Sequence, residues 1–154
     1  MKNLLLIILL VLVTKASLAQ SSKEIQWISF EQLSDSLSVN PKKVFLYFHT
    51  DWCVYCKKMD RESFQNEEVI QKLNKDYYAV KLDAETTDTI YFEQIPYTNK
   101  SIVKRSNQYH ALAEAFIPKG QEAAFPLTLI LSENFTITQR QTKYLSIKDL
   151  LRNL

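Results

Sequence analysis

The two cysteines of the chain, Cys53 and Cys56, are separated by only two residues and lie between an apolar run and a charged, helix-compatible segment. A disulfide that encloses two residues constrains the unfolded chain very little, so a purely structural bridge is disfavoured. Zinc normally takes four protein ligands, which argues against a metal site at this pair. The spacing therefore predicts redox chemistry, in which Cys53 exchanges with a substrate disulfide and Cys56 resolves the mixed disulfide.

The helix expected around the cysteines gives them different roles. A helix from about residue 53 to residue 64 places Cys53 at its N-terminus, where unpaired backbone N–H groups and the helix dipole favour a thiolate. Cys56 lies one turn further in, close enough for a disulfide but more covered. We therefore expect Cys53 and Cys56 to be the catalytic residues and to form a redox-active disulfide.

The run Val44–His49 directly precedes this site and positions it. The run is continuous in apolar and aromatic residues rather than alternating, which is typical of a central strand buried on both faces. Residues 25–28 and 77–82 predict two further strands, and the helices between them are long enough for parallel pairing. Thr50 and Asp51 are expected to form the turn from the strand into the helix.

The remaining segments complete an α/β pattern. In chain order they predict a helix from Ser29, a helix from Asn66, a hairpin over 90–92 and 95–97, a helix over 109–116, strands over 127–131 and 135–141, and a helix from Ser146. The hairpin would belong to an insertion near residues 86–106. The sequence thus predicts a mixed central sheet flanked by helices.

Residues 1–19 have the features of a signal peptide. Lys2 precedes the apolar run Leu4–Val13, and Ser17-Leu18-Ala19 supplies small residues where a signal peptidase cleaves. The alternative is a retained anchor, but the run is shorter than the roughly 20 apolar residues of a membrane span. We expect cleavage after Ala19, one mature domain over residues 20–154, no membrane span after cleavage, and a periplasmic or secreted location.

The composition excludes several classes of function. Removal of residues 1–19 takes away Lys2 and Lys15, which leaves as many basic residues as the 17 acidic ones. The chain has no basic stripe with interleaved aromatic residues, so nucleic acid is not an expected partner. Its single glycine, Gly120, excludes a glycine-rich phosphate loop. No cofactor and no metal are expected.

The string Trp52-Cys53-Val54-Tyr55-Cys56-Lys57 between a strand and a helix, with Pro126 about seventy residues later, resembles the thioredoxin-like superfamily. Locally it is most similar to the C-terminal domain of the exported thiol reductase DsbD. The resemblance implies a thioredoxin fold over roughly residues 25–154. It also implies a cis-proline at Pro126, a specificity role for Phe125 and a wall of the site at Trp52, which makes these three the expected substrate-binding residues. Without the resemblance, Pro126 would be expected only to open an edge strand, and Trp52 could be an ordinary packing residue.

The sequence departs from the family pattern at two places. Many thioredoxins have a buried aspartate six residues before the first cysteine, and this chain has Tyr47 there. Asp83 and Glu85 are alternative proton-handling groups, although solvated turn residues are the favoured interpretation. The residues between the cysteines are Val54 and Tyr55, with no histidine to stabilise a thiolate strongly. We therefore expect a moderately lowered pKa for Cys53 and a fairly reducing pair.

Several other residues have two interpretations. The ring of His49, at the end of a strand and four residues before Cys53, is expected to be structural rather than catalytic. His110 is expected at the surface. The aromatic residues of the insertion are either part of its core or a docking patch, and the sequence does not decide between the two: Tyr91, Phe92 and Tyr97.

The favoured function is an exported thiol–disulfide oxidoreductase that reduces protein disulfides. Its partners would be protein disulfide clients and an upstream thiol reductant. The alternative from a different class is a thioredoxin-like protein-binding module with little redox activity. A disulfide isomerase is disfavoured because no dimerisation segment is evident, and a monomer is expected.

Overall fold

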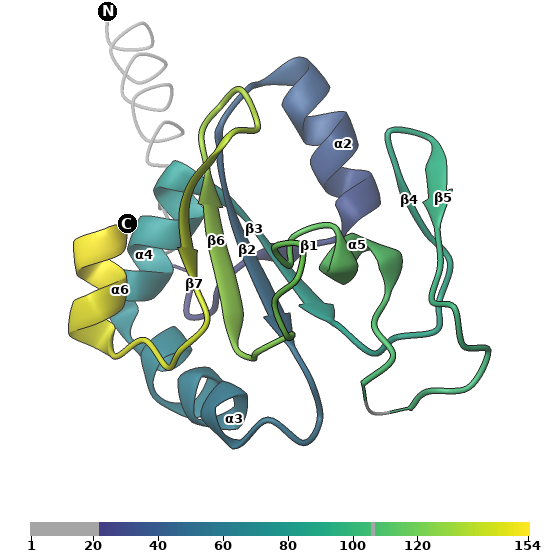
Figure 1. Cartoon of the computed structure of the whole chain (residues 1–154). Coiled ribbons are helices and arrows are strands. Elements are labelled where there is room, and N and C mark those ends of the chain that lie inside the picture. Colours follow the sequence, from purple (N-terminus) through teal and green to yellow (C-terminus); the bar gives the residue numbers. More distant parts are fainter. Residues whose placement is uncertain (1–21, 106) are drawn as a thin grey trace, which may run out of the picture.

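The centre of the molecule is a mixed sheet of five strands in the order β1–β3–β2–β6–β7 (Figure 1). The structure is a computed structural model that describes residues 22–105 and 107–154. The strands are β1 Trp27–Ile28, β2 Lys43–His49, β3 Tyr77–Asp83, β6 Leu127–Leu131 and β7 Ile137–Gln141. β1, β3 and β2 run parallel, whereas β6 and β7 pair antiparallel. The predicted α/β class with a mixed sheet is confirmed.

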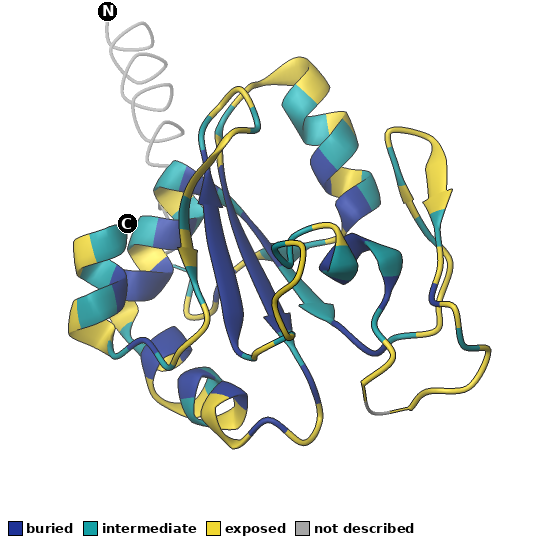
Figure 2. Ribbon diagram, viewed as in Figure 1, coloured by how far each residue is buried: buried dark blue, intermediate teal, exposed yellow. Residues whose placement is uncertain are grey.

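Strand β2 is buried on both faces, as its unbroken apolar sequence predicted. Its five residues from Val44 to Phe48 are all buried, and β3 and β6 hydrogen-bond to its two edges (Figure 2). Such a strand is held by apolar contacts above and below and by backbone hydrogen bonds on each side. It is therefore a rigid support for the loop that follows it.

Helices cover both faces of the sheet (Figure 1). The helices are α2 Phe30–Val39, α3 Val54–Arg61, α4 Glu67–Asp76, α5 Ala111–Glu114 and α6 Ile147–Asn153, with a 3₁₀ turn η1 at Ser63–Gln65. Residues of α2 and α5 form one apolar cluster with the sheet. Residues of α3, η1, α4 and α6 form the other, which includes both cysteines. The two layers match the flanking helices that the sequence predicted.

Side-chain caps define where three of these helices begin. Ser29 and Gln32 form a capping box at α2, the Asn66 side chain accepts from two backbone N–H groups of α4, and the Ser146 hydroxyl accepts from Asp149 N–H at α6. Each cap satisfies N–H groups that have no partner within the helix, which typically contributes about 1 kcal/mol. The predicted helix starts are confirmed at all three positions.

Two predicted helices are shorter in the structure. The helix expected to reach residue 64 ends at Arg61, because Ser63 turns inward and its hydroxyl donates to Leu145 O at 2.7 Å. The helix expected over 109–116 is only α5, Ala111–Glu114. His110 caps it, and Tyr109 lies before its first turn and packs against Phe125 instead.

The predicted insertion contains a two-stranded hairpin of β4 (Ile90–Phe92) and β5 (Ile95–Tyr97). The Tyr91 N–H donates to Glu31 of α2 at 2.8 Å, which ties the hairpin to the domain. The Phe92 ring packs edge-on against Phe30, with centroids 5.8 Å apart. Phe92 and Tyr97 therefore pack against the core, whereas Tyr91 is exposed.

The predicted signal peptide over residues 1–19 lies outside the described residues. In the part of the chain that the structure describes, no helix combines the length and the apolar composition needed to cross a membrane.

Candidate active site

The turn after β2 presents Cys53 at the start of α3. The chain leaves the strand at His49, and the Cys53 N–H donates back to Thr50 O at 3.2 Å. Cys53 then occupies the N-cap position of α3, and its Sγ accepts a hydrogen bond from the Cys56 N–H at 3.0 Å. A backbone donor aimed at the sulfur and the positive end of the helix dipole both favour negative charge on Cys53.

Cys53 and Cys56 are joined in a disulfide, with an S–S distance of 2.02 Å. Their residues are only 3% and 1% exposed, and they sit at the edge of the cluster formed by α3, α4 and α6. Both sulfurs are therefore bonded to each other rather than free to bind a metal. The described residues also include no group of three or more histidine, cysteine or acidic side chains that could hold a metal ion.

Trp52 is held in place by a buried carboxylate that the sequence interpretation missed. Its indole N–H donates to Glu85 Oε1 at 2.8 Å, and the same oxygen accepts from the Asn107 N–H at 3.1 Å. Glu85 is 2% exposed, so the expectation of a solvated turn residue is wrong. Two long-range donors bond one oxygen of the carboxylate, which lowers the cost of its burial. Its position just past the end of the strand beside β2 was the one available signal.

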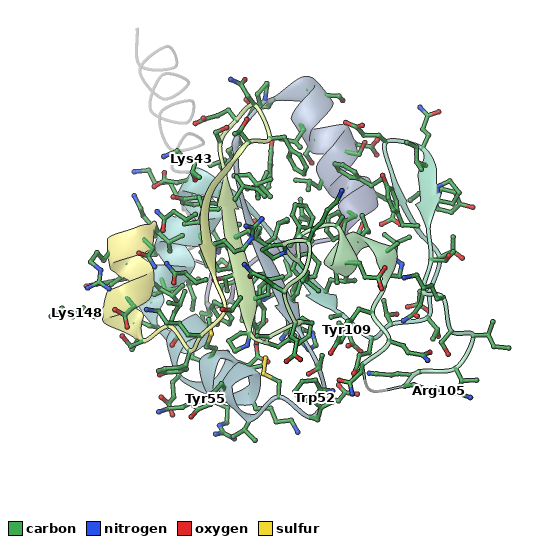
Figure 3. The ribbon with its side chains drawn as sticks, in the orientation of Figure 1. Lys43, Trp52, Tyr55, Arg105, Tyr109 and Lys148 are labelled. Carbon is green, nitrogen blue, oxygen red and sulfur yellow. A yellow bond between two sulfur atoms is a disulfide. The ribbon has the colours of Figure 1, made fainter. Side chains whose placement is uncertain are left out.

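An aromatic wall continues from Trp52 across the end of β6. The Phe125 ring lies 6.2 Å from the Trp52 ring and 5.2 Å from the Tyr109 ring. The Phe125–Pro126 peptide bond is cis, as the resemblance implied. Leu127 pairs with Phe48 of β2, so Pro126 lies at the end of β2 from which the cysteine loop emerges. Figure 3 shows Trp52 and Tyr55 at the same end of the molecule as the disulfide.

Tyr47 lies behind the cysteines, at the position where many thioredoxins have an aspartate. Its side chain is buried and its hydroxyl donates to Cys56 O at 3.2 Å. Burial, with a smaller effect of the nearby Asp60 carboxylate, raises the pKa of Tyr47 far above its ordinary value. The phenol therefore stays protonated near neutral pH and serves as a hydrogen-bond donor rather than a base.

An ion pair flanks the Tyr47 ring. Lys81 Nζ is 2.8 Å from Asp60 Oδ1 and 5.5 Å from the centre of the ring. Asp60 follows Cys56 by four residues in α3, so the two side chains share a face of the helix. Among the described groups around Tyr47, Asp60 is thus the carboxylate on the same helix face as Cys56. The sequence interpretation considered Asp83 and Glu85 as proton-handling groups and did not consider Asp60.

The two histidines have different environments. His49 stacks on Tyr47 with centroids 5.7 Å apart, and burial, followed by the nearby Lys81 charge, lowers its pKa. His110 was expected at the surface, and this is wrong because it is fully buried. Its Nδ1 accepts from the Leu112 N–H at 3.2 Å to cap α5, and its Nε2 lies 3.1 Å from Tyr97 O. These contacts give His110 a structural role.

Asp51, in the cysteine loop, and Asp83, at the end of β3, share one cation. Lys104 Nζ lies 2.6 Å from Asp51 Oδ2 and also pairs with the Asp83 carboxylate. The hydrogen bond from Lys104 and its charge lower the pKa of Asp51. Asp83 is therefore not a free turn residue, as the sequence had suggested, but part of a link between the insertion and the cysteine loop.

Residues 26–113 match the family described as thioredoxin-like. The chain belongs to this thioredoxin-like family. Among curated relatives, the Thiol:disulfide interchange protein DsbD of Campylobacter jejuni is 26% identical over 126 residues. That match covers 82% of this chain but only 18% of the relative, so the chain spans less than a fifth of that protein's length.

Solved thioredoxin-like structures confirm the fold. A thioredoxin from Thermus thermophilus superposes with a TM-score of 0.59 at 15% identity and covers 84% of each chain. The C-terminal domain of DsbD from Neisseria meningitidis, in the oxidised form, gives a TM-score of 0.51 at 18% identity, covering 79% of this chain and 86% of that domain. The thioredoxin fold and the similarity to the DsbD C-terminal domain, both inferred from the cysteine motif, are thereby confirmed.

Proposed function

We propose that this protein is an exported thiol–disulfide oxidoreductase that reduces protein disulfides through Cys53 and Cys56. The observation that carries the proposal is the disulfide at the N-terminus of α3, with the Cys56 N–H donating to Cys53 Sγ at 3.0 Å. The Campylobacter relative is a thiol:disulfide interchange protein, which supports the same chemistry. Membership of the thioredoxin-like family supports thiol–disulfide exchange in general, and the reducing direction is our proposal.

The proposed reaction starts from the reduced pair. The Cys53 thiolate attacks one sulfur of a client disulfide, a mixed disulfide forms, and one client thiolate leaves. The Cys56 thiol then loses its proton and attacks Cys53 Sγ, which releases the second client thiolate and closes the Cys53–Cys56 disulfide. The client disulfide has gained two electrons, and an upstream thiol reductant restores the dithiol by the reverse exchange.

We propose that Asp60 accepts the proton that Cys56 releases. Asp60 lies one helical turn after Cys56 on α3 and forms an ion pair with Lys81 at 2.8 Å. Tyr47 is excluded as the base because its raised pKa keeps it protonated. Instead, its bond to Cys56 O fixes the first turn of α3 against the sheet.

The client would contact the aromatic wall beside Cys53. We propose Trp52, Phe125 and Pro126 as the substrate-binding residues. Trp52 and Phe125 pack against each other, and the Glu85 carboxylate fixes the Trp52 ring. A rigid apolar wall beside a nearly buried sulfur suits a polypeptide that approaches in an extended conformation.

Export and a monomeric state are also part of the proposal. The N-terminal charge, apolar run and small residues before Gln20 support a signal peptide over residues 1–19 and a mature domain over 20–154. A periplasmic or secreted location would place the protein where disulfides form and persist. Cell fractionation and the N-terminal sequence of the mature protein test export, and sedimentation tests the monomeric state.

The reduction of insulin by dithiothreitol tests the proposed activity. The wild-type protein should accelerate the appearance of reduced, insoluble insulin B chain, and Cys53→Ser should abolish the acceleration because the attacking sulfur is gone. Val39→Ser, on the far end of α2, is the matched control and should behave as wild type. Equal rates with and without the wild-type protein would instead favour the protein-binding module.

A redox titration against a thiol buffer tests the reducing direction. The residues between the cysteines, Val54 and Tyr55, include no histidine that would stabilise the thiolate strongly. We therefore expect a potential well below that of a strong oxidant such as DsbA, which is about −120 mV. A value near that level would mean that the pair oxidises its clients.

A further inference from the structure

The second half of the insertion is an arm with a fixed base. We define the arm as the described residues 99–105 and 107–110. Its two ends, Asn99 and His110, pair across an antiparallel bridge. The Asn99 side-chain amide donates to Thr86 O at 3.1 Å and to Gln108 O at 2.9 Å. One side chain therefore closes the loop and joins it to the end of β3.

The arm is also latched to the loop that carries Cys53. Lys104 bridges Asp51 and Asp83, so a residue of the arm contacts the chain two positions before Cys53. The Asn107 N–H and the Trp52 indole N–H donate to the same oxygen of Glu85. The arm is thus connected at two points to the residues that frame the active site, although it follows them by about fifty residues in sequence.

The tip of the arm presents apolar side chains to solvent. Ile102 is 95% exposed and Val103 is 55% exposed. The turn is ordered nonetheless, because the Ser101 hydroxyl donates to Val103 O at 2.7 Å and the Ser101 N–H donates to Asn99 Oδ1 at 3.0 Å. Two adjacent apolar side chains held in water on an anchored turn differ from the single exposed apolar residues found on any surface.

Apolar side chains also extend along the cysteine loop itself. Trp52, Val54 and Tyr55 are all exposed around the buried Cys53. Figure 3 shows the arm, marked by Arg105, and the loop, marked by Trp52 and Tyr55, at the same end of the molecule. The charge of Lys104 is neutralised by Asp51 and Asp83. Lys104 is therefore not a free cation beside the apolar side chains of the tip.

We propose that the tip residues Ile102 and Val103 are a second docking contact for the client polypeptide. The occupant is an extended client chain with an apolar side chain a few residues from its reactive disulfide. A chain attached to Cys53 through a mixed disulfide spans roughly 10–17 Å with three to five extended residues. The ion pair of Lys104 with Asp51 joins the arm to the cysteine loop from which such a chain would extend. This inference rests on the proposed function and specifies which clients the site prefers.

Comparison of two disulfide substrates tests the inference. The protein substrate is insulin and the small substrate is oxidised glutathione, whose short chains end close to the sulfurs. The variant Ile102→Ser/Val103→Ser should raise KM for insulin about tenfold, a size expected from the loss of two partly buried apolar contacts. Its kcat for insulin and its kcat/KM for oxidised glutathione should stay within about twofold of wild type.

Two further variants serve as controls. Ile102→Leu/Val103→Leu keeps the apolar surface and should restore the wild-type KM for insulin. Val39→Ser removes an apolar side chain that is 85% exposed at the end of α2. It should leave KM and kcat unchanged for both substrates. Restoration by leucine would show that apolar contact, and not a change in folding, sets KM.

Two results would overturn the docking role. One is an unchanged KM for insulin in the serine variant. The other is an equal fall in kcat/KM for oxidised glutathione, which would mean that the arm affects the sulfur chemistry itself. A wild-type protein that reduces neither substrate would overturn the proposed function, and this inference with it. If the wild-type protein reduces both substrates and the serine variant has an unchanged KM for insulin, this inference alone is overturned.

Discussion

At the residue scale, the most informative position is Tyr47. Its side chain occupies the place of a buried acid in many thioredoxins, but its raised pKa keeps it neutral. Asp60 on α3, which pairs with Lys81 on β3, is the carboxylate that we propose for proton transfer. Under this proposal, proton transfer belongs to Asp60 and packing behind the cysteines belongs to Tyr47.

Substitution of Tyr47 by phenylalanine separates these two roles. Tyr47→Phe removes only the hydrogen bond to Cys56 O, so we expect the free energy of unfolding to fall by about 0.5–1.5 kcal/mol. The rate of insulin reduction and its pH dependence should stay near those of wild type. Urea unfolding and the pH–rate profile are the measurements, and a profile that loses a titration step would identify Tyr47 as the proton acceptor.

Asp60→Asn should act on the chemistry instead. Loss of the carboxylate leaves the Cys56 thiol without its proposed proton acceptor, and we expect the resolving step to slow by at least about tenfold. The mixed disulfide with the client should then accumulate, which non-reducing electrophoresis detects. Asp76→Asn also breaks an ion pair, with Lys72, but is remote from the cysteines and is the matched control. Equal rates for the two variants would contradict the role of Asp60.

The sequence predicted the positions of residues correctly where their surroundings are local in the chain. Cys53 and Cys56 are placed by a strand, a turn and a helix that are contiguous in the chain. Glu85 and His110 were misjudged because their burial depends on distant partners. Glu85 is covered by donors from Trp52 and Asn107, and His110 is fixed through Tyr97. Composition near a polar residue does not reveal such contacts.

At the element scale, the β4–β5 hairpin has a turn that its sequence does not favour. Glu93 and Gln94 both have positive φ, at 51° and 63°. Two-residue hairpin loops with this conformation favour Asn-Gly, because left-handed backbone is costly for residues with longer side chains. The hairpin persists because contacts with α2 hold it, through Tyr91 and Phe92.

Replacement of the turn should therefore stabilise the protein. Glu93→Asn/Gln94→Gly suits the observed conformation, and we expect the free energy of unfolding to rise by about 1 kcal/mol or more. Thermal and urea unfolding measure the gain. The matched control is Glu133→Asn/Asn134→Gly, in a turn where positive φ is found at Phe135 instead. A loss of stability in the hairpin variant would show that the side chains of Glu93 and Gln94 matter more than the backbone.

The sequence predicted elements best where a cap or an unbroken apolar run marks them. Ser29, Asn66 and Ser146 begin helices as expected, and β2 is central because both of its faces are apolar. The helix around residue 111 was overestimated, since its apolar spacing continues through Tyr109, whose ring packs on Phe125. The path of the arm was not predicted, because it depends on ion pairs formed across about fifty residues.

At the scale of the whole molecule, His49 should make stability depend on pH. Burial and Lys81 lower the pKa of His49 in the folded state, so the unfolded chain binds the proton more readily. The contribution is fully present above the unfolded pKa of about 6.5 and is lost as the pH falls below it. We expect the free energy of unfolding to drop between pH 7 and pH 5.

The variant His49→Gln isolates this contribution. It has no imidazole to protonate, so its stability should fall less than that of wild type over the same range. Urea unfolding at intervals of half a pH unit provides the comparison. Parallel curves for the two proteins would mean that His49 is protonated equally in the folded and unfolded states.

The central claim is that Cys53 attacks the client and Cys56 resolves the complex. Trapping tests it most directly: each single-serine variant is incubated with disulfide-bonded insulin, quenched with acid and analysed by non-reducing electrophoresis and mass spectrometry. Cys56→Ser should yield a stable mixed disulfide on Cys53, whereas Cys53→Ser should yield little adduct, because Cys56 lies within α3 and lacks the helix N-terminal donor that Cys53 Sγ accepts. Equal adducts on both variants, or on neither, would contradict the account.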